Sequence, residues 1–170
     1  ATLSNLCLKP KKCVIVPLWA FDAGNVKNLV REFARDWADF QVCDHAKYLG
    51  FWLGPGALEK SWDAPTLKFK ARAQRLRAAG LGLVPTAVQY SISVVTVLSH
   101  VMQTSFAPQS TLYAAKEALQ LLTAGPRHAF TEHPLVTMRR YHRAAQFHSL
   151  QAMNVAALVR TAHRTSTVSQ

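Results

Sequence analysis

The chain has 170 residues, about the size of one domain, and 49% of them are apolar, so it is long enough to bury a core. Lys and Arg outnumber Asp and Glu by 20 to 9, which gives a formal net charge of +11. This composition argues against a disordered chain and against an ordinary acidic enzyme, and the positive field would attract phosphate backbones, anionic membrane surfaces or acidic proteins.

The first elements predicted along the chain are a short strand and an amphipathic helix. Residues 12–18 are rich in β-branched side chains and stop at a proline, which is typical of a strand. Apolar side chains then recur at helical spacing from Val26 to Trp37, with charged residues between them. This pattern predicts a helix over 25–38, with Asn25 as its N-cap.

The next segment predicts a β-hairpin. Phe40 and Val42 alternate with polar neighbours, which indicates a strand, and the polar residues at 44–45 suggest a turn. A second strand is expected over 47–53, because Gly, Pro and Gly follow at 54–56. The predicted order is therefore strand, tight turn, strand.

Beyond a loop over 54–64, a cationic helix is predicted from Pro65 to about Ala79. Proline is well suited to the first turn of a helix. Basic side chains lie on both flanks of the apolar face of this helix, and no acidic residue lies among them. The five cations are Lys68, Lys70, Arg72, Arg75 and Arg77. They form either a nucleic-acid-binding surface or an ordinary solvated face.

Residues 78–115 contain no Asp, Glu, Lys or Arg. Within this segment, polar side chains recur at steps of three and four residues and draw one narrow stripe along an otherwise apolar helix over 81–102. The stripe consists of Thr86, Gln89, Ser93, Thr96, His100 and Gln103. We expect a central helix that is covered on several sides. A membrane span is the alternative, because a segment of about 20 residues is long enough to cross a bilayer.

Two further helices are predicted after the uncharged segment. Ser110 or Thr111 can cap a helix that ends at Gly125 and Pro126. A last helix is expected over 134–165. The second half of the chain therefore predicts an all-helical bundle.

A domain boundary is expected after residue 63, where charge balance and predicted secondary structure change together. Residues 1–63 hold 8 basic and 7 acidic side chains, whereas residues 64–170 hold 12 basic and 2 acidic ones. We expect an α+β, mainly α fold, with a strand, a helix and a hairpin in the first domain and a basic helical bundle in the second. The second domain carries nearly the whole positive field.

Common catalytic and cofactor motifs are absent from the sequence. It contains no GxxxxGK(S/T), GxGxxG or GxSxG pattern, so nucleotide hydrolysis, dinucleotide binding and serine hydrolase chemistry lack their usual residues. Three cysteines are too few for a disulfide scaffold, which favours an intracellular, reducing compartment. Cys7, Cys13, Cys43 and His45 could form a zinc set, but their spacing matches no common zinc finger. We therefore expect no metal or other cofactor.

Two segments together resemble a known family. The run LSNLCLKPKKCVIVPL (3–18) resembles motif D of the reverse transcriptases of non-LTR (LINE-type) retroelements, and VCDHAKYLGFWLGPG (42–56) resembles their motif E hairpin, the primer grip. The intervening helix and the following cationic helix fit the same order. The resemblance covers roughly residues 3–125 and, more weakly, the rest. It implies the closing edge of a palm subdomain followed by an all-helical thumb.

The resemblance also implies roles for individual residues. Lys12 matches the motif D lysine that lies near the incoming triphosphate, and Tyr48, Leu49 and Gly50 match the hairpin that holds the primer end. Two positions depart from the family pattern, since Asn5 and Lys9 stand where the family often has Gly and Asn. The catalytic (Y/F)xDD aspartates and the terminal Cys/His knuckle have no counterpart in this sequence. Polymerisation by this chain alone is not expected, because phosphoryl transfer needs carboxylates that hold metal ions.

Two functions from different classes remain open. The first is a non-catalytic, reverse-transcriptase-like fragment that binds primer-template or RNA backbone through its basic helical domain. The second is a retroelement-derived structural subunit of a large assembly, either with or without membrane contact, whose partner proteins would cover residues 78–115. In a third reading the chain is part of a longer polymerase, and the active site lies outside these residues.

Overall fold

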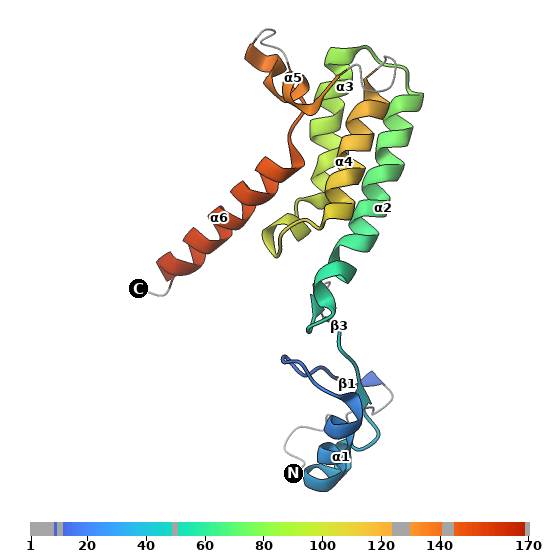
Figure 1. The fold of residues 1–170 in the computed structure, drawn as a ribbon, viewed down its shortest axis with the longest axis vertical. Coiled ribbons are helices and arrows are strands. Elements are labelled where there is room, and N and C mark those ends of the chain that lie inside the picture. The colour runs from blue at the N-terminus through green and yellow to red at the C-terminus, as the bar shows by residue number, and fades with distance from the viewer. Residues whose placement is uncertain (1–8, 10–11, 49–50, 124–129, 141–144, 169–170) are drawn as a thin grey trace. The chain divides into compact units, whose positions relative to one another are not determined.

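The protein is mainly helical with a few short strands, which confirms the predicted fold class. Figure 1 shows the ribbon of the computed structural model. The structure describes residues 9, 12–48, 51–123, 130–140 and 145–168. The chain divides into two compact units, Ala1–Ser61 and Trp62–Gln170, whereas the sequence places the boundary after residue 63.

The first unit begins with a β–α–β arrangement. Strands β1 (Val14–Ile15) and β2 (Gln41–Val42) pair in parallel, and helix α1 (Ala23–Phe33) connects them. The strand predicted over 12–18 is thus present but only two residues long. Parallel strands need a crossover connection, and a helix is the usual one.

Helix α1 begins and ends earlier than predicted. Its N-cap is Asp22 rather than Asn25, because the Asp22 carboxylate accepts hydrogen bonds from the backbone N–H groups of Gly24 and Asn25. An acidic cap suits the positive end of the helix dipole. The helix ends at Phe33, since Ala34 leaves the helical conformation, and a separate 3₁₀ turn follows over Arg35–Trp37.

The hairpin is present, but its predicted strand limits and turn are wrong. Strands β3 (Ala46–Tyr48) and β4 (Phe51–Leu53) pair antiparallel with Ala46 opposite Leu53, so both strands lie almost wholly within the single strand predicted over 47–53. Residues 41–42 belong to β2 instead and pair with β1. The polar residues at 44–45 only bend the chain between the two sheets.

Helix α2 (Ala57–Ala78) begins eight residues before the predicted start, with Pro65 inside it. The residues from Ala57 to Lys60 all favour helix, and Glu59 lies in the first turn, where the helix dipole stabilises an anion. Pro65 removes one backbone hydrogen-bond donor and does not end the helix. The predicted loop over 54–64 is therefore wrong for most of its length.

The helix predicted over 81–102 is present, but its hydrogen-bonding pattern changes along its length. We call residues 83–103 the central helix. Its parts are α3 (Leu83–Gln89), a π turn (Tyr90–Val94) and two 3₁₀ turns (Val95–Leu98 and Val101–Gln103). Hydroxyls of Ser91, Ser93 and Thr96 donate to carbonyls four residues earlier, which competes with the backbone ladder. Within the described part of the chain, no helix is both long and apolar enough to cross a membrane.

Helix α4 (Gln109–Leu122) begins without a side-chain cap. Its N-cap is Pro108, so neither Ser110 nor Thr111 has the predicted capping role. The Thr111 hydroxyl is buried and lies 2.9 Å from the Thr66 hydroxyl of α2, which ties the two helices together. The predicted stop at Gly125 and Pro126 lies outside the described residues.

The single helix predicted over 134–165 is instead two helices. Helix α5 (Glu132–Thr137) continues as a 3₁₀ turn to Arg140, and helix α6 (Leu150–Val168) follows a non-helical segment. Phe147 in this segment is fully buried, and its backbone N–H donates to the Leu135 carbonyl at 3.2 Å. The described residues 145–149 are not helical, and this segment places the Phe147 ring in the core.

The core of the second unit contains three aromatic rings in edge or tilted contact. Tyr90 of the central helix lies between Phe69 of α2 and Phe147, with ring centroids 6.2 and 5.3 Å away. All three are fully buried, as is Trp62, whose indole N–H donates to the Ser105 hydroxyl at 2.9 Å. These contacts hold α2, the central helix and the segment before α6 in one bundle.

Candidate nucleic-acid interface

The cations of α2 lie on two flanks of one helix. Its core face is defined by the buried side chains of Phe69, Ala73 and Leu76. Given 3.6 residues per turn, the five cations divide into two groups on opposite sides of that face. The basic flank consists of Lys68, Arg72 and Arg75, and the α4 flank consists of Lys70 and Arg77. All five are exposed, so the helix does not use them to build its core.

The basic flank borders the central helix. Arg72 Nη1 donates a 2.6 Å hydrogen bond to the Ser93 carbonyl. Four of the five guanidinium N–H donors are left after this bond. In the described part of the chain, no carboxylate forms an ion pair with Lys68, Arg72 or Arg75. This flank therefore presents uncompensated positive charge.

The α4 flank has a different electrostatic environment. Lys70 Nζ lies 3.9 Å from a carboxylate oxygen of Glu117 on α4. Lys70, Arg77 and Glu117 line one groove of about 610 Å³ between the two helices. The pair is half-exposed and adds little to stability, but the carboxylate reduces the attraction of this groove for a phosphate.

The polar stripe faces outward along the central helix, apart from its first residue. Thr86 is buried, and its hydroxyl donates to the Leu81 carbonyl. The other five members, from Gln89 to Gln103, are exposed or half-buried. Since Ser93 and Thr96 donate to their own helix, they offer outside ligands only acceptor atoms. The stripe is thus an uncharged, wettable surface beside the basic flank.

The residues matched to motifs D and E lie in the first unit. Lys12 is exposed, and its backbone N–H donates to the Lys9 carbonyl at 2.9 Å. Tyr48 at the end of β3 is 63% exposed, so its ring is not part of a core. Leu49 and Gly50 lie outside the described residues.

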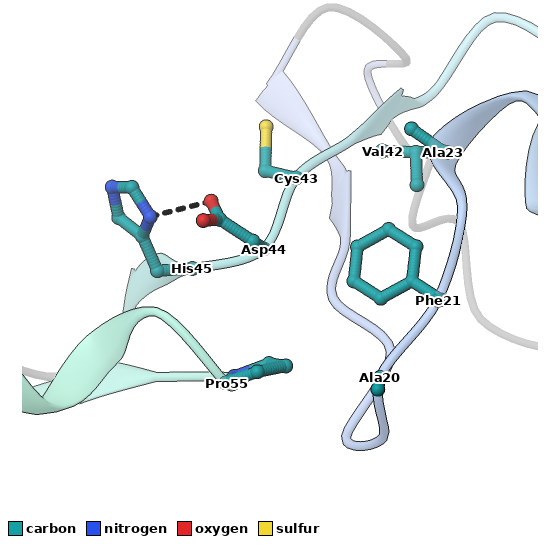
Figure 2. A pocket seen from close by; sticks show the side chains of 8 residues that line it. All are labelled: Ala20, Phe21, Ala23, Val42, Cys43, Asp44, His45 and Pro55. Atoms are coloured by element: carbon teal, nitrogen blue, oxygen red, sulfur yellow. Dashed lines mark hydrogen bonds and ion pairs between the residues drawn. The ribbon is translucent and has the colours of Figure 1, made fainter.

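The first unit also contains a pocket of about 580 Å³, shown in Figure 2. His45 Nδ1 and Asp44 Oδ1 are 2.6 Å apart on its wall, and Cys43 lies next to them in the chain. A Cβ on Gly54 would collide with the Asp44 carbonyl, so this glycine lets the turn wrap closely around Asp44. No three His, Cys, Asp or Glu side chains of the described residues gather as metal ligands. Of the hypothetical zinc set, Cys7 lies outside those residues.

Sequence reasoning missed two cations on α6. Arg160 and Arg164 lie one turn apart and line a groove with Ser99 and Gln103 of the central helix. Their spacing of four residues in a predicted helix indicates that both side chains lie on the same helix face. The sequence could not show that this face meets the end of the polar stripe.

Comparison with known proteins gives no match. No family model matches the chain, and no curated protein or solved structure is significantly similar to it. The resemblance to LINE-type reverse transcriptases therefore stays an expectation that rests on residues 3–18 and 42–56.

Proposed function

We propose that the chain binds the phosphate backbone of nucleic acids through the basic flank of α2, without reading base sequence. The observation that carries this proposal is the position of Lys68, Arg72 and Arg75. They are three exposed cations with no ion-pair partner among the described residues, on a helix edge beside an uncharged polar surface.

Phosphate contacts of this kind give affinity without sequence information. Each Lys or Arg that neutralises a phosphate releases a condensed counterion, and this release drives binding. The hydrogen bond from Arg72 to Ser93 holds the guanidinium against the central helix, so less side-chain entropy is lost when a phosphate binds. The proposal assigns no chemical step to the chain.

Two double variants of the full chain test the proposal. Lys68→Gln with Arg75→Gln removes two cations of the basic flank, and Lys70→Gln with Arg77→Gln removes two cations of the α4 flank. Both pairs combine one Lys and one Arg seven residues apart on the same helix, so the change in charge and in helix propensity is matched. Affinity for a labelled primer-template duplex is measured by fluorescence anisotropy at about 0.1 M salt.

We expect the basic-flank variant to lose at least about tenfold in affinity, because two counterions fewer are released. The α4-flank variant should stay within about threefold of wild type, since its cations already face Glu117. Equal losses in both variants would contradict a localised site, and unchanged affinity in the basic-flank variant would contradict the proposal itself.

A second candidate function, that of a subunit docked in a protein assembly, is favoured by the first unit. Helix α1 buries none of its residues, and β1 and β2 form a two-stranded parallel pair. Parallel sheets are usually covered on both faces and contain more strands. The exposed large apolar side chains of this unit include Leu18, Trp19, Leu29, Phe33 and Trp37. By contrast, Val94, Val95 and Leu98, within the uncharged segment 78–115, lie in the core of the second unit.

Sedimentation of the isolated chain tests this candidate. If the first unit normally docks on a protein, its exposed apolar side chains should cause self-association. Trp19→Gln with Phe33→Gln should then lower the average mass. The control, Leu67→Gln with Tyr113→Gln, changes two equally exposed side chains of the second unit and should not. A monomeric wild-type chain would contradict this candidate.

A further inference from the structure

We infer that Arg160 and Arg164 of α6 form a second phosphate-binding site at the C-terminal end of the polar stripe, whereas Arg72 contacts the stripe near its middle, at Ser93. This inference rests on the proposed function and extends its surface to residues outside α2. The ligand class is the same, a phosphodiester backbone, and the added claim is that one backbone contacts both the basic flank of α2 and the α6 groove.

The site is a groove of about 260 Å³ between the central helix and α6. Its polar wall is formed by Ser99, Gln103, Arg160, Thr161 and Arg164, and its apolar lining includes Met102 and Met153. Arg160 Nε donates to the Ala156 carbonyl of its own helix at 3.4 Å. The terminal nitrogens of the guanidinium are not used by that bond and can reach a phosphate.

The charge of this groove distinguishes it from the two grooves beside α4. Glu117 lines one of those grooves together with Lys70 and Arg77, and Glu132 lines the other together with Lys116. Among the described residues, no carboxylate lines the groove that holds Arg160 and Arg164. An anion in it therefore meets two positive charges without a competing negative one.

The groove is held by a buried hydrogen-bond network. Asn154 of α6 donates from Nδ2 to the carbonyls of Met102 and Ser105, and its Oδ1 accepts from the backbone N–H of Ala107. These bonds fix α6 against the end of the central helix. Arg160 and Arg164 follow Asn154 by about two and three helical turns. They therefore lie on a helix whose position these hydrogen bonds fix.

The polar stripe connects the two cationic sites. Arg72 contacts the backbone at Ser93, while Ser99 and Gln103 line the α6 groove. Ser99 and Gln103 follow Ser93 by six and ten residues, which corresponds to about 9–15 Å along the helix axis. Each strand of duplex DNA carries one charge per about 3.4 Å of axis, so a backbone that follows the stripe from Ser93 to Gln103 has phosphates at both points.

The test is the salt dependence of affinity in Arg160→Gln with Arg164→Gln. Affinity of the full chain for the primer-template duplex is measured between 50 and 200 mM salt. The loss of two phosphate contacts should reduce the slope of log affinity against log salt by about 1.8. The control, Lys27→Gln with Arg31→Gln on α1, also removes two exposed cations four residues apart and should leave the slope unchanged. Urea unfolding of both variants should match wild type, because these are surface substitutions.

The outcomes separate this inference from the proposed function. A reduced slope in the α6 variant together with an unchanged control supports the inference. If the α6 variant keeps the wild-type slope while Lys68→Gln with Arg75→Gln weakens binding, the inference is overturned and the proposed function stands. If wild type shows no salt-dependent binding, the proposed function is overturned, and this inference with it.

Discussion

Removal of the Asn154 side chain should destabilise the second unit strongly. Asn154 is 3% exposed and makes three hydrogen bonds of 2.9 to 3.0 Å, to the Met102 and Ser105 carbonyls and from the Ala107 N–H. Asn154→Ala leaves the buried Met102 carbonyl without a partner, which costs about 2 kcal/mol. Each of the two part-buried groups can rebind water and adds about 0.5 kcal/mol, so the expected total is about 3 kcal/mol.

Thermal unfolding followed by helical circular dichroism measures this effect. For a chain of this size, about 3 kcal/mol corresponds to a lower Tm by about 10 °C. Gln151→Ala is the control, since it removes an exposed amide from the same helix and should change stability by less than about 0.5 kcal/mol. Equal Tm values for the two variants would refute the assignment of Asn154 as the residue that fixes α6.

Two further substitutions test the core and the hairpin. Tyr90 carries a buried hydroxyl without a hydrogen-bond partner in the described part of the chain. Tyr90→Phe should therefore raise the free energy of unfolding, measured by urea titration, by about 1 kcal/mol. A loss of stability in this variant would show that the hydroxyl has a partner. Burial, and to a lesser extent Glu132, raises the pKa of this hydroxyl; wild-type stability should therefore fall as pH rises above about 10, and Tyr90→Phe should lack that share of the fall. Gly54 has φ +117°, and a Cβ at this position would lie 2.6 Å from Val16 Cγ1. Gly54→Ala should therefore destabilise the first unit by about 2 kcal/mol or more and shift the NMR signals of β3 and β4. Unchanged β3 and β4 signals in that variant would contradict the turn geometry.

Local sequence signals predicted which elements form better than where they begin and end. The amphipathic pattern from Val26 to Trp37 located α1, but the better hydrogen-bond acceptor at Asp22 set its start. Pro65 suggested a helix start and lies inside α2 instead, because the preceding residues already favour helix. The break before α6 could not be predicted, since it depends on the Phe147 ring entering a core made by distant segments.

The candidate site shows the same limit. Helical spacing alone separates the basic flank from the α4 flank. The sequence could not show that Glu117 faces the α4 flank or that Arg72 contacts Ser93. Both contacts depend on how α2, α4 and the central helix pack. Arg160 and Arg164 were missed for the same reason, since their groove exists only where α6 docks beside Gln103.

The most direct test of nucleic-acid binding is the salt dependence of the wild-type chain. With three to five phosphate contacts, log affinity for a primer-template duplex should fall with log salt at a slope of about −2.7 to −4.5. Between 50 and 200 mM salt, the affinity should therefore fall by about 40- to 500-fold. An affinity that stays constant over this range, or no binding at 50 mM, would contradict the proposal that the basic flank binds a phosphate backbone.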